Sequence, residues 1–388
     1  MRILMAAPLL PHPASTAGGA LVIFGEIEAL ARRHDVVLVS FAGASPADRE
    51  GLETLRQLGI TVHYVWRGSA RGLAVLRRRI ALAVRWAAGS DPLRALKFQD
   101  PAMQAAIDEA AQGRRFDLLH VEDSAMGQYR YPPGIPSVLT DQDVRAADEG
   151  PQPEARRWRG YQRTVWRRFD RIQVYTERDA AGLRRLAPDL AERIRVNPFG
   201  VDVDPATDAT AEREDELVFV GGFHHAPNVD AACWLVRDIL PLVRAQRESA
   251  HLTIVGADPP RAVRVLASER VTVTGFVPDV APYLHRAAVV VAPLRAGRGM
   301  RVKLLQALAR GKAVVTTPLG AEGLAPDAPL RIASSAAEIA AAIIMCLNDP
   351  VARRSLGHEA RAFVAEHHSW SGFANRLAAI YRELGLDP

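Results

Sequence analysis

The chain has 388 residues, of which 48% are hydrophobic and 24% are charged. This length is too great for one ordinary core and fits two domains of about 150 to 200 residues each, and the composition excludes a disordered protein. The formal net charge of +5 is modest and does not by itself indicate a nucleic-acid partner. The only cysteines are Cys233 and Cys346, which excludes a disulfide framework or a thiolate metal site and favours a reducing, cytoplasmic location.

Short β-type runs alternate with amphipathic helices through the first half of the chain. This alternation predicts a doubly wound parallel sheet with right-handed crossovers. The long loop after the first strand ends in Gly18 and Gly19 at a helix start, where the backbone can approach a ligand closely. The expected strands are residues 2–7, 36–41, 60–66, 116–122, 137–140, 172–176 and 193–196.

Polar side chains follow two of these strands where each strand ends. His120, Glu122 and Asp123 close one strand, and Asp141 and Asp143 follow the next. Ligands of open α/β sheets collect at the carboxyl ends of the strands, so these residues are candidates for a site that faces a cleft. A solvated strand end is an equally good interpretation of the same pattern.

Residues 71–86 predict a helix with apolar and basic residues in register. Leu73, Leu76, Ile80 and Val84 share one face, and arginines surround it. A basic amphipathic helix of this kind can lie on an anionic membrane surface. A packed helix with a solvated arginine face is the favoured interpretation.

Residues 155–169 interleave six arginines with Trp158, Tyr161 and Trp166. Arginine beside aromatic residues can bind single-stranded nucleic acid, or it can cover a helix surface with cation–π contacts. We favour the second interpretation and expect no nucleic-acid partner, because no recognisable nucleic-acid-binding fold accompanies the segment.

The pattern of strands and helices restarts after a polar, acidic stretch near residues 205–215, which is the expected domain boundary. Strands are expected near residues 217–222, 252–256, 271–276, 289–293 and 313–317. Helices are expected over residues 228–246, 262–268, 337–347, 351–367 and 372–384.

Residues 289–324 predict a strand, a glycine-and-arginine loop, a helix and a second strand. Gly299 lies just before the helix, so the backbone N–H groups of Met300 and Arg301 are expected among the unpaired donors of its first turn. Arg301 and Lys303 add two positive charges beside these donors. This arrangement predicts a phosphate-binding helix N-terminus at the edge of a parallel sheet.

Glycines also follow two other strands of the second half. Gly221 and Gly222 end the first of these strands, and a second glycine turn at residues 318–324 follows the helix and strand just described. Both turns are expected to face the same cleft as Arg301.

Six segments of the second half, in order and spacing, resemble the GT-B glycosyltransferases of the family-4 type, which transfer a sugar from a nucleotide-sugar. The first half is similar more loosely, through RILMAAPLLPHP with Gly18 and Gly19, FDLLHVE, and PFGVD (198–202). The six segments are FVGGFHHAPNVDAACWL (219–235), DILPLV (238–243), LTIVGADPP (252–260), VTVTGFVPDVAPYL (271–284), residues 289–324 and HEARAFVAEHHSW (358–370).

The resemblance implies the α/β GT-B fold, with two Rossmann-like parallel-sheet domains facing an inter-domain cleft and a C-terminal helix crossing back. The implied parts are an acceptor-side domain at 1–205, a nucleotide-sugar-binding domain at 206–370 and the returning helix at 371–388. It also implies transfer with retention of configuration to a glycan, lipid-linked or small-molecule acceptor, without a metal or cofactor. The implied setting is cytoplasmic, with peripheral contact at the inner membrane face left open.

The resemblance also assigns roles to individual residues. Arg301 and Lys303 would neutralise the diphosphate, Gln306 would hold the ribose, and Glu122 and Asp143 would line the acceptor side as further catalytic candidates. The donor site implied in this way consists of Gly18, Gly19, Gly221, Gly222, Phe276, Val277, Gly299, Met300, Arg301, Lys303 and Gln306.

Three positions differ from the family pattern. Arg298 and Gln306 stand where the family has the E-x7-E acid pair, His224 and His225 occupy a segment where many members carry Arg and Lys, and Glu122 matches a histidine of some members. Two alternatives therefore stay open. One is a non-catalytic GT-B subunit that stabilises a partner enzyme, and the other is a pseudo-glycosyltransferase or epimerase on the same fold.

Overall fold

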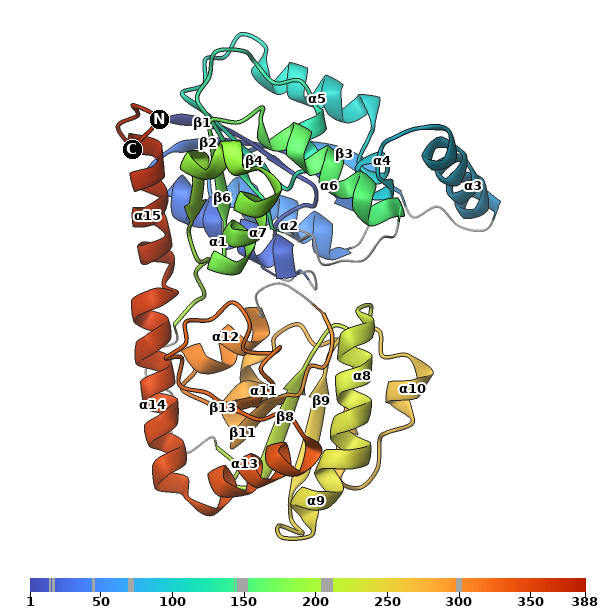
Figure 1. Cartoon of the computed structure of the whole chain (residues 1–388), viewed down its shortest axis with the longest axis vertical. Coiled ribbons are helices and arrows are strands. Elements are labelled where there is room, and N and C mark those ends of the chain that lie inside the picture. Colours follow the sequence, from blue (N-terminus) through green and yellow to red (C-terminus); the bar gives the residue numbers. More distant parts are fainter. Residues whose placement is uncertain are drawn as a thin grey trace. The chain divides into compact units, whose positions relative to one another are not determined.

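The chain forms two compact units in a computed structural model that describes residues 1–13, 15, 18–43, 46–68, 73–142, 144, 153–203, 212–297 and 302–388. Unit 1 consists of Met1–Phe199 and Phe373–Pro388, and unit 2 of Gly200–Gly372. Figure 1 shows the elements of both units. Most of the acidic stretch at 205–215, where we expected the boundary, lies outside the described residues.

Unit 1 is built on a seven-stranded sheet in the order β3-β2-β1-β4-β5-β6-β7. All of its strand pairs are parallel, as expected. The central strands are almost wholly buried, because helices cover both faces of a doubly wound sheet. The strands are β1 (Arg2–Ala7), β2 (Asp35–Gly43), β3 (Thr61–Arg67), β4 (Leu118–Glu122), β5 (Ser137–Thr140), β6 (Arg171–Val174) and β7 (Ile194–Val196).

Two helices of unit 1 begin at side chains that cap their first turns. Asp100 accepts from the N–H of Ala102 at the start of α5, and Thr176 accepts from the N–H of Asp179 at the start of α7. The helices are α1 (Gly18–Ala31), α2 (Pro46–Gln57), α3 (Leu73–Ala88), α4 (Leu93–Lys97), α5 (Pro101–Ala111), α6 (Pro153–Trp166) and α7 (Glu177–Leu186).

The aromatic residues of the arginine-rich segment belong to α6 and face the interior of unit 1. Trp158 is 1% exposed and Trp166 is fully buried. The guanidinium of Arg94 lies over the Trp158 ring, 5.0 Å from its centroid. These buried rings offer no stacking platform for bases. Arg157 of the segment lies 4.3 Å from the centroid of the Trp86 ring, which agrees with the cation–π interpretation.

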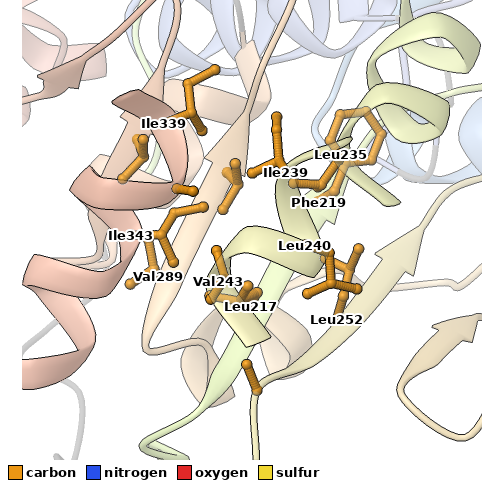
Figure 2. Close-up of a cluster of buried hydrophobic side chains, with 14 of the residues drawn as sticks. Leu217, Phe219, Leu235, Ile239, Leu240, Val243, Leu252, Val289, Ile339 and Ile343 are labelled. Atoms are coloured by element: carbon orange, nitrogen blue, oxygen red, sulfur yellow. The ribbon is translucent and has the colours of Figure 1, made fainter. Parts of the chain in front are cut away.

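Unit 2 contains a second, six-stranded parallel sheet in the order β10-β9-β8-β11-β12-β13. Figure 2 shows its core, in which Leu217, Phe219 and Leu252 of the sheet pack against helical residues such as Ile239 and Ile343. The two-residue strand β13 has no sequence pattern and was not expected. The strands are β8 (Glu216–Val220), β9 (His251–Val255), β10 (Val271–Val273), β11 (Val289–Ala292), β12 (Ala313–Thr316) and β13 (Arg331–Ile332).

The helix expected over residues 228–246 contains a wide turn. α8 (Ala226–Trp234) passes through a π-helical segment, Leu235–Ile239, into α9 (Leu240–Arg244). Pro241 explains the widening, because it has no N–H to donate and its ring would clash with the carbonyl four residues earlier. The other helices are α10 (Arg261–Arg264), α11 (Ala281–Arg286), α12 (Val302–Ala309), α13 (Ala336–Asn348) and α14 (Pro350–His367).

The last helix, α15 (Trp370–Arg382), crosses back, and its residues from Phe373 onward belong to unit 1. Arg376 donates to Asn197 Oδ1 at 2.9 Å, and Glu383 just beyond the helix pairs with Arg171 and Arg195. The returning helix implied by the resemblance is thus confirmed. Within the part of the chain that the structure describes, no helix has the length and hydropathy needed to span a bilayer.

Candidate functional site

Each sheet has one point at which the strand order reverses, and several of the expected site residues lie near these two points. In unit 1 the reversal lies between β1 and β4, and in unit 2 between β8 and β11. Gly18 and Gly19 start the helix that follows β1, and Glu122 ends β4. Lys303 lies on the helix that follows β11. Ligands of open α/β sheets bind outside the carboxyl ends of strands at such switch points.

Three titratable side chains meet in the interior of unit 1 at its switch point. Glu26 of α1, His120 and Glu122 are all fully buried. The Nε2 atom of His120 lies 3.4 Å from Glu26 Oε1, 3.3 Å from Glu122 Oε1 and 2.7 Å from Thr140 Oγ1. Burying two ionised carboxylates side by side without water costs free energy unless one of them is protonated. The stability of this cluster therefore depends on the protonation states of its members.

Burial raises the pKa of Glu26 well above its ordinary value, and the neighbouring Glu122 raises it further. Both effects favour the protonated form of Glu26, which could donate a hydrogen bond to a neighbouring acceptor. The ligand atoms of Glu26, His120 and Glu122 lie within 4.8 Å of one another, close enough to hold a metal ion.

Gln142 connects this buried cluster to the start of α1. Its Nε2 donates to Glu122 Oε2 at 2.7 Å. A Cβ on Gly19 would lie 2.7 Å from Gln142 Oε1, so a larger residue at this position would require the Gln142 amide to shift. Gly19 and Glu122 therefore both lie next to Gln142, which is partly exposed, whereas Glu122 is buried.

The acids that follow Glu122 are structural. Asp123, at a φ of 74°, pairs with Arg94 and accepts from the N–H of Ala125. Asp141 accepts from Trp166 Nε1 at 2.7 Å and from Gln162 Nε2 at 2.9 Å, which ties α6 to the sheet. The solvated strand end that we considered for these residues is therefore wrong.

Burial, with a contribution from Asp123, raises the pKa of Asp141 to about 6. Asp143, the other acceptor-side candidate of this loop, lies outside the described residues.

In unit 2, Gly221 and Gly222 form a tight turn directly after β8. The N–H of Gly221 donates to Val255 O at 2.9 Å, and a Cβ on Gly256 would lie 1.8 Å from Gly221 O. A Cβ on Gly222 would lie 2.8 Å from Cε1 of His224. The loops after β8 and β9 thus approach each other so closely that Gly256 leaves no room for a side chain.

Lys303 and Gln306 lie one turn apart on α12 and share its outer face. Both side chains are partly exposed, whereas Leu304 and Leu305 point into the core. Burial lowers the pKa of Lys303. Among the described residues, no carboxylate lies within ion-pair distance of its amine, so Lys303 is a partly desolvated cation that lacks an anion.

Arg298, Gly299, Met300 and Arg301, which were expected to form the phosphate-binding helix start, lie outside the described residues.

Two further loops lie at the carboxyl ends of strands in unit 2. Phe276 and Val277 follow the edge strand β10, and the Phe276 ring is 56% exposed. In the second glycine turn, the N–H of Gly320 donates to Thr317 Oγ1 at 3.0 Å. A Cβ on Gly320 would lie 2.0 Å from Thr316 Oγ1, so this turn also requires glycine.

A pocket of about 810 Å³ lies elsewhere in unit 1, lined by residues that include Ser137, Arg171 and Glu383. Ser137 and Arg171 begin β5 and β6, so the pocket lies at the amino ends of these parallel strands. The pocket therefore lies at the other end of the strands from the switch point, where ligands of such sheets bind, and it is not the candidate site.

Sequence reasoning missed Glu26 and Tyr381. Glu26 is an acid inside the apolar face of α1, and this local conflict was the available signal. Tyr381 Oη lies 2.9 Å from His120 Nδ1, a contact between residues too far apart in sequence for any pattern to indicate.

Comparisons with solved structures agree with this architecture. Sucrose-phosphate synthase from Thermosynechococcus elongatus matches with a TM-score of 0.71 and 19% identity, over 99% of this chain and 98% of that chain. HepE from Anabaena, in complex with UDP and glucose, matches with a TM-score of 0.70 and 15% identity, over 99% and 100%. TarM of S. aureus matches with a TM-score of 0.70 and 10% identity, over 98% of each chain.

The two Rossmann-like units and these structural matches confirm the GT-B fold. The family description "Glycosyl transferase 4-like domain" matches residues 17–200, and "Glycosyl transferases group 1" matches residues 214–349. The chain therefore belongs to the GT-B glycosyltransferases of the family-4 type. A comparison with curated protein sequences found no match.

Proposed function

We propose that the protein transfers a sugar, with retention of configuration, from a nucleoside-diphosphate sugar to a glycan, lipid-linked or small-molecule acceptor. The observation that carries this proposal is Lys303, a partly desolvated cation with no ion-pair partner among the described residues, on the helix that follows β11. An amine held in this state gains most from an anion such as a diphosphate. Family membership supports the same chemistry.

The donor is assigned to unit 2. Lys303, with Arg301 beside it in sequence, would neutralise charge on the departing diphosphate without a metal ion. The glycine turn at Gly221 and Gly222 would let the backbone approach the donor, and Gln306 would accept a hydrogen bond from a ribose hydroxyl. The exposed Phe276 ring offers a face on which a base could stack.

Two neighbours in the structural comparison support a uridine nucleotide. One HepE structure contains UDP-glucose. A TarM structure contains UDP and alpha-GlcNAc-glycerol. By analogy we propose a UDP-sugar as the first donor to test, and the acceptor is assigned to unit 1, near Gln142, Glu122 and Asp143.

Retention is consistent with the chemistry of unit 1. In a retaining transfer of this type the departing phosphate can accept the proton of the acceptor hydroxyl, so the protein need not supply a base. Glu122 is fully buried and already accepts from Gln142. We therefore propose that Glu122 positions Gln142 for acceptor binding. We also propose that the protein works in the cytoplasm, where the free thiols of Cys233 and Cys346 stay reduced.

A thermal-shift screen against nucleotides and nucleotide-sugars tests the donor assignment. The correct donor should raise the melting temperature by mass action, and its UDP, GDP or dTDP parent should do so more weakly. NMR of the product made with a labelled donor then gives the anomeric configuration. Inversion would contradict the retaining mechanism, and the absence of any nucleotide effect would contradict the donor site.

A non-catalytic subunit is the second candidate, and Gln306 favours it because an amide lacks the charge of the usual glutamate. Donor binding without hydrolysis or transfer, with or without acceptors, would support this candidate. A product that is an epimerised nucleotide-sugar, or a joined nucleotide-activated cyclitol, would instead indicate altered chemistry on the same fold.

A further inference from the structure

Helix α3 exposes three large apolar side chains on one face. Leu76 is 53% exposed, Ile80 is 54% exposed and Val84 is 60% exposed. In Figure 1, α3 lies at the outer edge of unit 1, beyond α4 and α6. The packed helix that we favoured from the sequence is therefore wrong for this face. Three large aliphatic side chains in a row are exposed here without any covering element among the described residues.

These three residues form one stripe with a positive charge on either side. Successive residues of a helix are about 100° apart, so positions four apart lie almost above one another. By the same rotation, Arg77 flanks the stripe on one side and Arg79 on the other, and both are exposed. The residues of α3 include four arginines and no acid.

The opposite side of α3 holds the helix in this orientation. Trp86 Nε1 donates to Glu154 Oε2 at 2.7 Å, and the Arg157 guanidinium lies 4.3 Å from the centroid of the Trp86 ring. Val75 and Leu82 are on the same side and are partly buried. Because these contacts fix the inner face, rotation of the helix cannot bury Leu76, Ile80 and Val84 in unit 1.

We propose that α3 docks unit 1 on an anionic lipid bilayer. The stripe Leu76–Ile80–Val84 enters the boundary between headgroups and acyl chains, and Arg77 and Arg79 contact anionic headgroups on its two sides. An amphipathic helix with an apolar face and a purely basic border matches such a surface in both polarity and charge. The proposal goes beyond sugar transfer and does not depend on it.

Vesicle flotation with the full-length protein tests this docking. We expect the protein to float with vesicles of phosphatidylcholine mixed with phosphatidylglycerol, and much less with phosphatidylcholine alone. The triple variant Leu76→Ser, Ile80→Ser, Val84→Ser should abolish flotation. Arg77→Glu with Arg79→Glu should weaken it by at least about fivefold for each charge, and added salt should weaken wild-type binding.

Matched controls lie on α14 of unit 2. Val351 is 71% exposed and Arg354 is also exposed, so Val351→Ser and Arg354→Glu should leave flotation unchanged. The triple variant removes only exposed side chains, so its circular dichroism and melting temperature should match those of the wild type.

Three results would overturn the proposal. The first is a failure of the wild-type protein to float with anionic vesicles, and the second is unchanged flotation of the triple variant. The third is a dimer, seen by light scattering, that the triple variant dissociates while vesicles do not bind, because the stripe would then contact a second copy of the chain. All three readouts are independent of enzymatic activity.

Discussion

The Tyr381 hydroxyl on the returning helix α15 lies 2.9 Å from Nδ1 of His120 on β4, 261 residues earlier in the chain. The other ring nitrogen of His120 faces Thr140, Glu26 and Glu122. Thr140 also accepts from Gln173, whose amide oxygen accepts from Asn197. One buried hydrogen-bond network therefore holds both the returning helix and the acids at the switch point of unit 1.

We expect Tyr381→Phe to destabilise the protein by about 1–3 kcal/mol, because it leaves Nδ1 of His120 without its hydroxyl partner in a fully buried site. Urea denaturation of both proteins measures the difference. Tyr64→Phe is the matched control, because Tyr64 is partly exposed and its ring contact with Trp66 survives the change. Equal denaturation midpoints for Tyr381→Phe and the wild type would contradict a role for this bond.

Glu383 should stabilise the docking of the C-terminal segment in a pH-dependent way. The hydrogen bond from Arg195, with Arg171 beside it, lowers the pKa of Glu383 below its ordinary value of 4.5. A lowered pKa means that this stability is fully present above pH 4.5 and is lost as the pH falls through the folded-state pKa.

Replacing Glu383 with Gln should therefore cost up to about 1 kcal/mol at neutral pH, since the pair is partly solvated, and less in acid. Melting temperatures of the variant and the wild type, measured from pH 7 to pH 3, should differ at neutral pH and approach each other as the pH falls. Glu177→Gln, at a largely exposed ion pair with Arg184, should show little effect at any pH.

The raised pKa of Glu26 predicts the opposite dependence on pH. The stability that the protonated Glu26 provides is fully present below pH 4.5 and declines as the pH rises toward the folded-state pKa. Glu26→Gln keeps a neutral side chain and should therefore gain stability relative to the wild type, by up to about 1.4 kcal/mol for each pH unit in that interval.

Denaturation midpoints across the pH range test the prediction for Glu26. The control is Glu28→Gln on the same helix, where the carboxylate is partly exposed and pairs with Arg32. A Glu26→Gln variant that is less stable than the wild type, by the same amount at every pH, would show that Glu26 is ionised in the folded protein.

Lys303→Ala should lower kcat/KM for the donor by on the order of 10²-fold or more, because the amine would act on charge that develops as the diphosphate leaves. Lys97→Ala, on an exposed lysine of α4, should leave the rate unchanged. Steady-state kinetics with the donor found in the thermal-shift screen provide the measurement. Full activity of the Lys303→Ala variant would contradict the donor site proposed here.

The spacing of residues in the sequence was sufficient to predict the two parallel sheets, most of their strands and helices, and the residues at the strand ends. This is because period-two and period-3.6 spacing and glycine turns are local properties of the chain. The same local rules predict that Gly19, Glu122, Gly221 and Lys303 lie near the carboxyl ends of parallel strands. We did not predict the π turn before Pro241, although the proline is a local signal for it. The two-residue strand β13 has no local signal, because packing decides it.

Only the tertiary structure decided which polar groups meet and which faces stay open. Glu26, His120 and Tyr381 come from α1, β4 and α15, which are far apart in the sequence. Their contact depends on the conformational entropy lost on folding and on the free energy of burying polar groups, and local spacing encodes neither. The orientation of α3 is a further case, since the spacing of Leu76, Ile80 and Val84 predicts an apolar face but not its direction. The anchoring of Trp86 by Glu154 and Arg157 turned that face outward.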